Sequence, residues 1–197
     1  MCPLQSRFYI GVDPSVTSTG VVIIGQNETY VHRIQPGKRR GPECLDYIVT
    51  HLDMAIANSE IADTWKSLTP GELLAAVEGP ALGATSRADD LGQVRGVILL
   101  TLYRHGIPSL IVAPTSLKKF ATGHGQAKKD KMIQTAVAEL KRELNDDEAD
   151  AYWLSRIAQA YHDEGETLTR AQREVLHGIR NPKTRMQSPM FTRDISV

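Results

Sequence analysis

The segment RFYIGVDPSVTSTGVVIIG, residues 7–25, decides the fold of this chain. Its apolar runs, 7–13 and 19–25, are rich in β-branched residues and flank a polar turn, which predicts two neighbouring strands. Residues 28–34, ETYVHRI, predict a third strand that closes a β-meander. The chain therefore opens on three strands, and Asp13 ends the first of them.

Beyond the meander, apolar spacing predicts helices and strands in alternation. The predicted helices cover about 43–58, 87–105, 128–143 and 146–161, and the predicted strands cover 72–78 and 109–113. This order predicts an α/β fold, with a mixed five-stranded sheet and helices on both faces. We expect one domain over residues 1–162 and a basic C-terminal extension over 163–197, with one short helix near 169–179.

Composition excludes several classes of protein. A chain of 197 residues, 41% of them hydrophobic, can bury one substantial core. No apolar run approaches the roughly 18 residues that span a bilayer, and the first residues lack the long apolar region of a signal peptide. Cys2 and Cys44 are the only cysteines, and no Cys/His cluster has zinc-ligand spacing. We expect a cytoplasmic protein without membrane contact or structural zinc.

The formal net charge is zero, but the charges are unevenly distributed. Residues 113–142 carry seven basic and two acidic residues, and residues 143–150 carry five acidic residues. A basic block beside an acidic block suits a site that binds phosphates and also holds metal cations. Two solvated helix faces would produce the same pattern, so charge alone leaves both explanations open.

Two acidic residues stand where predicted strands end. Asp13 follows the first apolar run, and Glu78 closes the run ELLAAVE, residues 72–78. A fourth strand parallel to the first would bring both carboxylates to one edge of the sheet, where a ligand can reach them. Taken singly, an Asp-Pro turn and a solvated strand end explain them as well.

The segment NDDEAD, residues 145–150, begins the last long helix. Asn145 is a good N-cap, and acidic residues in a first turn favour the helix dipole, so a structural explanation exists. At 100° per residue, however, Asp147 and Asp150 share one stripe with apolar residues that should pack inward. Those apolar residues are Leu154, Ile157 and Tyr161. Two inward carboxylates repel each other and lose hydration, so they need a compensating cation.

Together these acidic residues predict a metal site. The proposed catalytic and metal-binding residues are Asp13, Glu78, Asp147 and Asp150. A set of carboxylates without nearby histidine or cysteine favours Mg²⁺, with Mn²⁺ able to substitute. Two ions about 4 Å apart can activate a water and stabilise the leaving oxygen of a phosphodiester. Asp13 is our choice for the ligand shared by both ions, and no nucleotide cofactor is expected.

A basic segment precedes the acidic one. In APTSLKKFATGHGQAKKDK, residues 113–131, Lys128 and Lys129 begin a predicted helix, where cations oppose the helix dipole and favour a bound anion. The lysines expected to grip a DNA backbone, with salt-sensitive affinity, are Lys118, Lys119, Lys128 and Lys129. Phe120 could stack on a base, but an aromatic that anchors its own helix is the favoured interpretation.

These motifs, in this order and at this spacing, resemble those of RuvC-like Holliday-junction resolvases over residues 7–161. The matching stretches are IGVDPSVTSTGVVII, VEG with LGQVRG, SLKKFATGHGQAKKDK and DDEADA. The resemblance implies a ribonuclease-H-like fold and a homodimer that nicks opposite strands of a four-way junction with Mg²⁺, in DNA recombination and repair. It places the family's acidic residues at Asp13, Glu78, Asp147 and Asp150. Its DNA-contacting lysines fall at Lys118 and Lys129, and Arg95 falls on a helix near the dimer and DNA surface.

The chain departs from that family pattern in two places. Bacterial members usually place an aromatic residue shortly after the glutamate, whereas Glu78 is followed here by GPALG. The chain beyond residue 161 is also longer than the pattern. Both features resemble bacteriophage-encoded members, which act on a broader range of branched DNA and would work in the host cytoplasm.

Three other functions compete with a junction resolvase. DPSVTSTG resembles the first phosphate loop of actin-like or sugar-kinase ATPases, but that fold needs two related domains, which 197 residues do not accommodate. A non-catalytic junction-binding protein would not need all four carboxylates. Other ribonuclease-H-like nucleases, such as hybrid hydrolases or transposase-like enzymes, are the strongest rivals.

Overall fold

The computed structural model describes residues 7–59, 72–80, 88–163 and 167–181. The strands are β1 (Phe8–Asp13), β2 (Thr19–Ile24), β3 (Thr29–Ile34), β4 (Leu73–Glu78) and β5 (Ser109–Val112). The helices are α1 (Gly41–Ala57), α3 (Ala88–Arg104), α4 (Pro114–Thr122), α5 (Lys129–Leu140), α6 (Asp146–His162) and α7 (Arg170–Arg180). Across these described ranges, none of the helices is long and apolar enough to cross a membrane.

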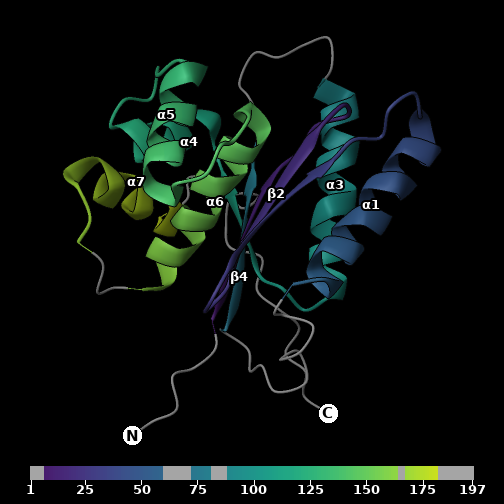
Figure 1. Cartoon of the computed structure of the whole chain (residues 1–197), viewed down its shortest axis with the longest axis horizontal. Helices are drawn as coiled ribbons and strands as arrows, with labels where there is room; N and C mark the ends of the chain where they lie inside the picture. Colours follow the sequence, from purple (N-terminus) through teal and green to yellow (C-terminus); the bar gives the residue numbers. More distant parts are fainter. Residues whose placement is uncertain (1–6, 60–71, 81–87, 164–166, 182–197) are drawn as a thin grey trace, which may run out of the picture.

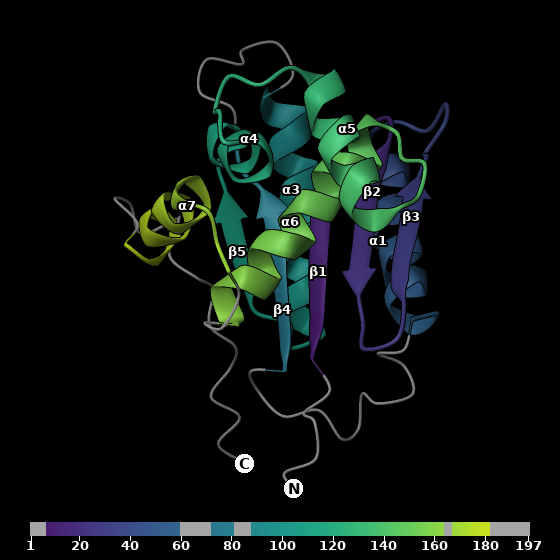
Figure 2. The same ribbon diagram turned by 60° about the vertical axis from the view of Figure 1, so that its left-hand side comes forward.

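The five strands form one mixed sheet in the order β3-β2-β1-β4-β5. Strand β2 runs antiparallel to both of its neighbours, while β1, β4 and β5 are parallel. Strands β1, β3, β4 and β5 therefore point the same way, and their C-terminal ends meet at one edge of the sheet (Figure 2). The predicted mixed sheet and the predicted parallel pairing of β1 with β4 are both confirmed.

Helices cover both faces of the sheet (Figure 1). Helix α6 lies across one face with α4, α5 and α7, and α1 and α3 cover the other. Alternation along β1 explains this, because Tyr9 belongs to the α6-side core while Phe8, Ile10 and Val12 belong to the α1/α3-side core. Since both faces are buried, the strand reads as a nearly continuous apolar run.

Two glycines set how closely α6 approaches the sheet. A Cβ atom on Gly11 of β1 would lie 1.9 Å from the carbonyl oxygen of Ala151, and one on Gly20 of β2 would lie 2.1 Å from that of Asp147. Any side chain at either position would push α6 outward. Backbone contact at these glycines therefore places the first turns of α6 directly over the ends of β1 and β2.

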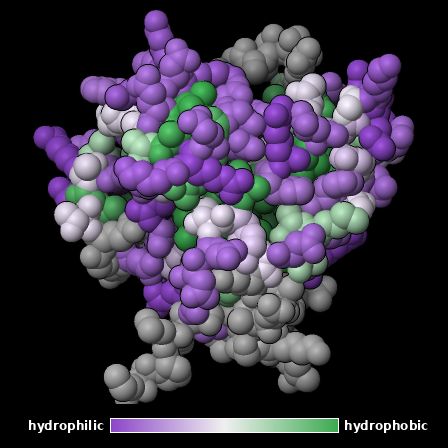
Figure 3. All heavy atoms as spheres, viewed as in Figure 1, coloured by the Kyte–Doolittle hydropathy of each residue, from purple (hydrophilic) through white to green (hydrophobic). Residues whose placement is uncertain are grey.

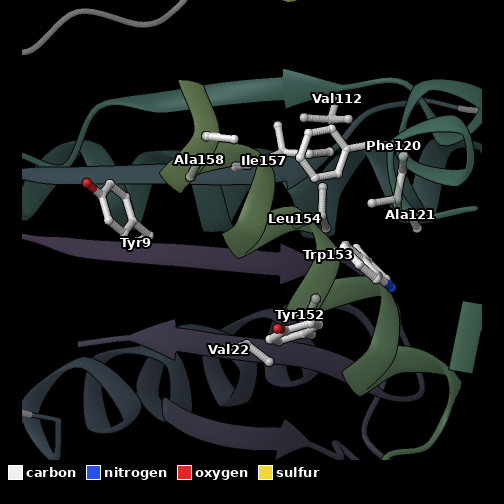
Figure 4. Packing of buried hydrophobic residues seen from close by; sticks show 14 of the residues in the cluster. Tyr9, Val22, Val112, Phe120, Ala121, Tyr152, Trp153, Leu154, Ile157 and Ala158 are labelled. Carbon is white, nitrogen blue, oxygen red and sulfur yellow. The ribbon is translucent and has the colours of Figure 1, made fainter. Parts of the chain in front are cut away.

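The bounds of helix α4 were not predicted, although Phe120 was expected to anchor a helix of its own. The helix has only nine residues, begins with Pro114 and ends at Thr122, and its C-cap is Gly123, whose φ of 84° is left-handed. The aromatic side chain of Phe120 is 4% exposed and packs edge-on to Trp153, with ring centroids 6.2 Å apart (Figure 4). The predicted role of Phe120 as the anchor of its helix is confirmed.

Helix α7 lies in the C-terminal extension and packs against α4, α6 and β5. Val175, Leu176 and Ile179 are buried and belong to the α6-side core. A capping box starts the helix, because the Thr169 side chain accepts from the Gln172 N–H and the Gln172 side chain accepts from the Thr169 N–H. By packing against β5, α7 also covers the edge strand of the sheet. Residues 182–197 lie outside the described part of the chain.

Candidate active site

Asp13 and Glu78 end two neighbouring parallel strands. Val12 pairs with Val77 in the ladder, so the carboxylates that follow them stand side by side at the sheet edge. Their carboxyl groups share a hydrogen bond, which raises the pKa of Asp13 and lowers that of Glu78. The two carboxyl groups therefore share one proton in the metal-free protein.

The local environment disfavours negative charge on three of the acidic residues. Burial raises the pKa of Asp13 well above its usual range, and the charges of Glu78, Asp150 and Asp147 raise it further. Burial, followed by the charge of Asp150, raises the pKa of Glu78 to about 7. Burial also raises the pKa of Asp150 to about 6. The four predicted carboxylates are thus brought into one electrostatic cluster.

The first turn of α6 separates its acidic residues by role. The Asn145 side chain accepts from the Glu148 N–H at 3.0 Å, and the Asn145 N–H donates to Glu148 Oε2 at 2.9 Å, forming a capping box. The predicted N-cap is confirmed. Asp146 forms an ion pair with Lys129, with Nζ and Oδ2 2.6 Å apart. Capping and pairing thus account for Glu148 and Asp146, while Asp147 and Asp150 raise the pKa of Asp13.

Two cations approach the cluster from opposite faces of the sheet. Lys118, on α4, and Arg95, on α3, both lower the pKa of Glu78, and Lys118 also lowers that of Asp150. Arg95 and Glu78 line a small cavity of about 90 Å³ together with Pro14. Positive charge therefore lies next to the carboxylates on both sides.

The other predicted lysines lie in different settings. Lys129 is 73% exposed, and its hydrogen bond to Asp146 raises its pKa, with smaller contributions from Asp150 and Asp147. Lys119 instead forms an ion pair with Glu174 of α7, at 2.6 Å between Nζ and Oε2. Lys128 is the exposed N-cap residue of α5. The structure thus brings Lys118, Lys129 and Arg95 to the acidic cluster, whereas Lys119 is bound to α7.

The chemistry of the cluster fits a hard divalent cation. All of its donors are carboxylate oxygens, and burial raises the pKa of Asp13, Glu78 and Asp150, so a nearby cation would favour their ionised forms. Within the described ranges, no three His, Cys, Asp or Glu side chains are grouped as a ready metal site.

Two features of this edge were not predicted from the sequence. The loop after Asp13 is held by hydrogen bonds between Ser15 and Thr19, with the Thr19 hydroxyl donating to the Ser15 carbonyl at 2.8 Å. The loop after β3, residues 36–42 with the sequence PGKRRGP, lies at the same edge because β3 is parallel to β1. The sequence contains both segments, but placing the second at this edge required the direction of β3.

The sheet order, with carboxylates at the ends of β1 and β4 and on α6, defines a ribonuclease-H-like α/β fold. Residues 76–156 match the family model for crossover junction endodeoxyribonuclease RuvC. The enzyme of that name from Synechococcus sp. (strain WH7803) is 30% identical over 152 residues, covering 72% of this chain and 91% of the relative. That from Synechococcus sp. (strain CC9605) is 31% identical over 160 residues, covering 75% and 98%. The chain belongs to the RuvC family.

Solved structures agree on the fold. The Thermus thermophilus RuvC structure superposes with a TM-score of 0.58 at 17% identity, covering 75% of this chain and 90% of that one. T. thermophilus RuvC in complex with Holliday junction substrate gives a TM-score of 0.61 at 16% identity, covering 76% and 90%. The ribonuclease-H-like fold expected from the sequence is confirmed, and α7 lies beyond the segment that the family model matches.

Proposed function

We propose that this protein is a structure-selective DNA endonuclease that resolves Holliday junctions and also cuts other branched DNA by phosphodiester hydrolysis. The observation that carries the proposal is the cluster of Asp13, Glu78, Asp147 and Asp150, half-buried at one sheet edge and flanked by Lys118 and Arg95. Family membership supports the same activity, because the named relatives are crossover junction endodeoxyribonucleases.

The proposed cofactor is Mg²⁺, two ions for each site, with Mn²⁺ able to substitute. Asp13 would be the ligand shared by both ions, and Glu78, Asp147 and Asp150 would complete the two shells. When bound, such ions supply an activated water and stabilise the leaving oxygen of the phosphodiester. The proton held between Asp13 and Glu78 must leave before both carboxyls can act as ligands.

The cations of the chain would bind and orient the DNA backbone. Lys118 and Arg95 lie beside the carboxylates on opposite faces of the sheet, so they can flank the reacting phosphodiester. Lys129, largely exposed in its pair with Asp146, can exchange that carboxylate for a DNA phosphate. Lys119 and Lys128 would contribute weaker, outlying contacts. Binding should therefore weaken as salt concentration rises.

We also propose that the protein acts as a homodimer. Large apolar side chains are exposed on α1 and α3, which pack against each other: Met54 is 51% exposed, Leu100 46% and Tyr103 43%. Such a surface suits an isologous interface between two copies of the chain. Two copies would provide two sites for two nicks in a symmetric junction. Sedimentation analysis at micromolar concentration should give a dimer, and a monomer would contradict this part of the proposal.

The proposed domain organisation is a nuclease domain over residues 1–162, followed by the extension over 163–197. The described part of the extension is α7, whose buried face joins the α6-side core of the domain. The Lys119–Glu174 pair provides a second connection between α4 and α7. On this basis α7 stabilises α4 and therefore the position of Lys118.

Incubating one protein preparation with four-way, three-way, flap, linear duplex and RNA–DNA hybrid substrates in Mg²⁺ tests the proposed function. We expect paired, symmetric nicks in opposite strands of the four-way junction, with slower cutting of the other branched substrates. Activity confined to the hybrid would instead assign a hybrid hydrolase on the same fold. Junction binding without any cutting would indicate a non-catalytic junction-binding protein.

A further inference from the structure

Residues 36–42, the loop after β3 together with the first two residues of α1, are here named the KRR loop and lie beside the candidate active site. Four parallel strands end at one edge of the sheet, in the order β3, β1, β4, β5 once the antiparallel β2 is passed over. The two central strands end in carboxylates, and β5 leads into α4, which carries Lys118. Strand β3 leads into the KRR loop. The carboxylates therefore lie between basic segments on both flanks of the sheet.

A cavity of about 270 Å³ opens between the KRR loop and the loop that follows Asp13. Arg39, Arg40, Asp90 and Gln93 supply charged and polar groups to its lining, and Val16, Leu45 and Val94 supply apolar ones. Thr17 is exposed and lies in the loop that begins directly after Asp13. Hydrophilic side chains cover the rim of the molecule over the start of α1 (Figure 3). The cavity thus has both polar and apolar walls and lies beside the loop that leaves Asp13.

The guanidinium of Arg39 is held mainly by an aromatic ring and a backbone carbonyl. It lies 4.1 Å from the centre of the Tyr47 ring and donates to the Pro36 carbonyl at 2.9 Å. The nearest ion pair is with Glu43, at 3.7 Å, and that carboxylate side chain is 73% exposed. An exposed pair at this distance contributes little. Arg39 is therefore oriented by a ring and a carbonyl while most of its charge stays available.

Arg40 is held in a similar way. Its guanidinium donates to the carbonyl of Arg39 at 2.7 Å and more weakly to that of Gly37 at 3.4 Å. Gly37 and Gly41 have φ values of 67° and 52°, so the loop can bend tightly enough to bring these carbonyls within reach. Carbonyl oxygens orient a guanidinium without neutralising it.

The start of α1 adds to this positive character. Arg40 is the N-cap residue in an extended conformation, and no side chain caps the helix. The free N–H groups and the dipole of this 17-residue helix therefore favour an anion at the cavity. Two carboxylates, Asp90 and Glu43, oppose this positive charge. Both raise the pKa of the buried Cys44 thiol nearby, whereas the two arginines lower it. The arginines, the adjacent exposed Lys38 and the helix end outweigh them.

We propose that this cavity binds a backbone phosphate of the DNA strand, on the β3 side of the carboxylates. The inference rests on the proposed nuclease function and adds a specific contact to it. Strands β1 and β3 are two strand spacings apart, roughly 10 Å. A strand of B-form DNA presents a phosphate about every 3.4 Å along its axis, so the bound phosphate lies within about three nucleotides of the cleaved bond.

The test is equilibrium binding of a fluorescent four-way junction in EDTA, measured at several salt concentrations. The variant Arg39→Gln/Arg40→Gln should bind several-fold more weakly, and its plot of log affinity against log salt should be shallower by about one. Arg40→Gln alone should show part of the effect, since it leaves the Arg39–Tyr47 stack intact. The matched control is Arg104→Gln, at the far end of α3, roughly 24 Å along the helix from Ala88.

The outcomes separate this inference from the proposed function. The phosphate site would be overturned if the double variant and Arg40→Gln gave the same slope of log affinity against log salt as the wild type, with melting temperatures unchanged. The nuclease proposal would then stay intact. An equal loss in Arg104→Gln would also overturn it, because the effect would then be one of total charge. Failure of the wild-type protein to bind or cut branched DNA would reject both proposals.

Discussion

Replacing Glu78 by glutamine should abolish nicking yet stabilise the metal-free protein. The glutamine keeps the size of the side chain and can still share a hydrogen bond with Asp13. It removes a carboxyl group whose ionisation is opposed first by burial and then by the charge of Asp150. A residue retained at a cost to stability is expected at a site that binds a cation.

The magnitude follows from the pKa of Glu78. Its ordinary value is 4.5 and its value in the folded protein is about 7, so full ionisation costs about 3 kcal/mol of folding free energy. Because the pKa of Glu78 is raised in the folded protein, its ionisation does not lower the stability of the wild type below about pH 4.5. The free energy of unfolding then falls as the pH rises through 7. The gain from Glu78→Gln should therefore be near zero at pH 4.5 and about 3 kcal/mol at pH 8.

Thermal melts of both proteins in EDTA at the two pH values provide the assay. For a chain of this size, about 3 kcal/mol corresponds to a rise in melting temperature of roughly 6–12 °C at pH 8. Adding Mg²⁺ should raise the melting temperature of the wild type much more than that of the variant. A variant that is destabilised equally at both pH values would refute the reasoning, because burial and repulsion at Glu78 would then cost nothing.

Three further expectations concern the position of α6, the extension and metal binding. Gly20→Ala should lower both the melting temperature and the nicking rate, since its Cβ would lie 2.1 Å from a backbone oxygen of α6. The control Gly96→Ala places its Cβ in open space and should be neutral or slightly stabilising. Equal melting temperatures for the two variants would contradict this expectation. Leu176→Ala should cost about 2–5 kcal/mol in denaturant unfolding, and no loss would mean that α7 is detached from the core. Calorimetry should show Mg²⁺ binding tightening from pH 5 to 8 as Glu78 and Asp150 ionise; a flat profile would argue against them as ligands.

Much of the fold could be predicted because the apolar pattern is strong. Short apolar runs located all five strands, and the spacing of apolar residues located the long helices, with ends within three residues. The parallel pairing of β1 and β4 followed from the mixed sheet and placed Asp13 beside Glu78. The bounds of helix α4 could not be predicted because the helix is short, contains two adjacent lysines and buries only Leu117, Phe120 and Ala121.

The details of the site depend on contacts between distant segments, which local patterns do not encode. Lys129 could be assigned to the basic segment, but its ion pair with Asp146 requires the crossing of α5 and α6. The pairing of Lys119 with Glu174 likewise depends on where the extension packs. The KRR loop reaches the site only because β3 points in the same direction as β1. Charge patterns thus identify candidate residues, and the topology decides which of them meet.

Metal-dependent nicking of a four-way junction by four single amide variants tests whether the four carboxylates form the active site. These variants are Asp13→Asn, Glu78→Gln, Asp147→Asn and Asp150→Asn, each compared with the wild type at the same level of junction binding in EDTA. We predict that the wild type makes paired nicks in Mg²⁺ and that every variant binds the junction without cutting it. Undiminished cutting by any one variant would remove that carboxylate from the site, and cutting by all four would place the active site elsewhere.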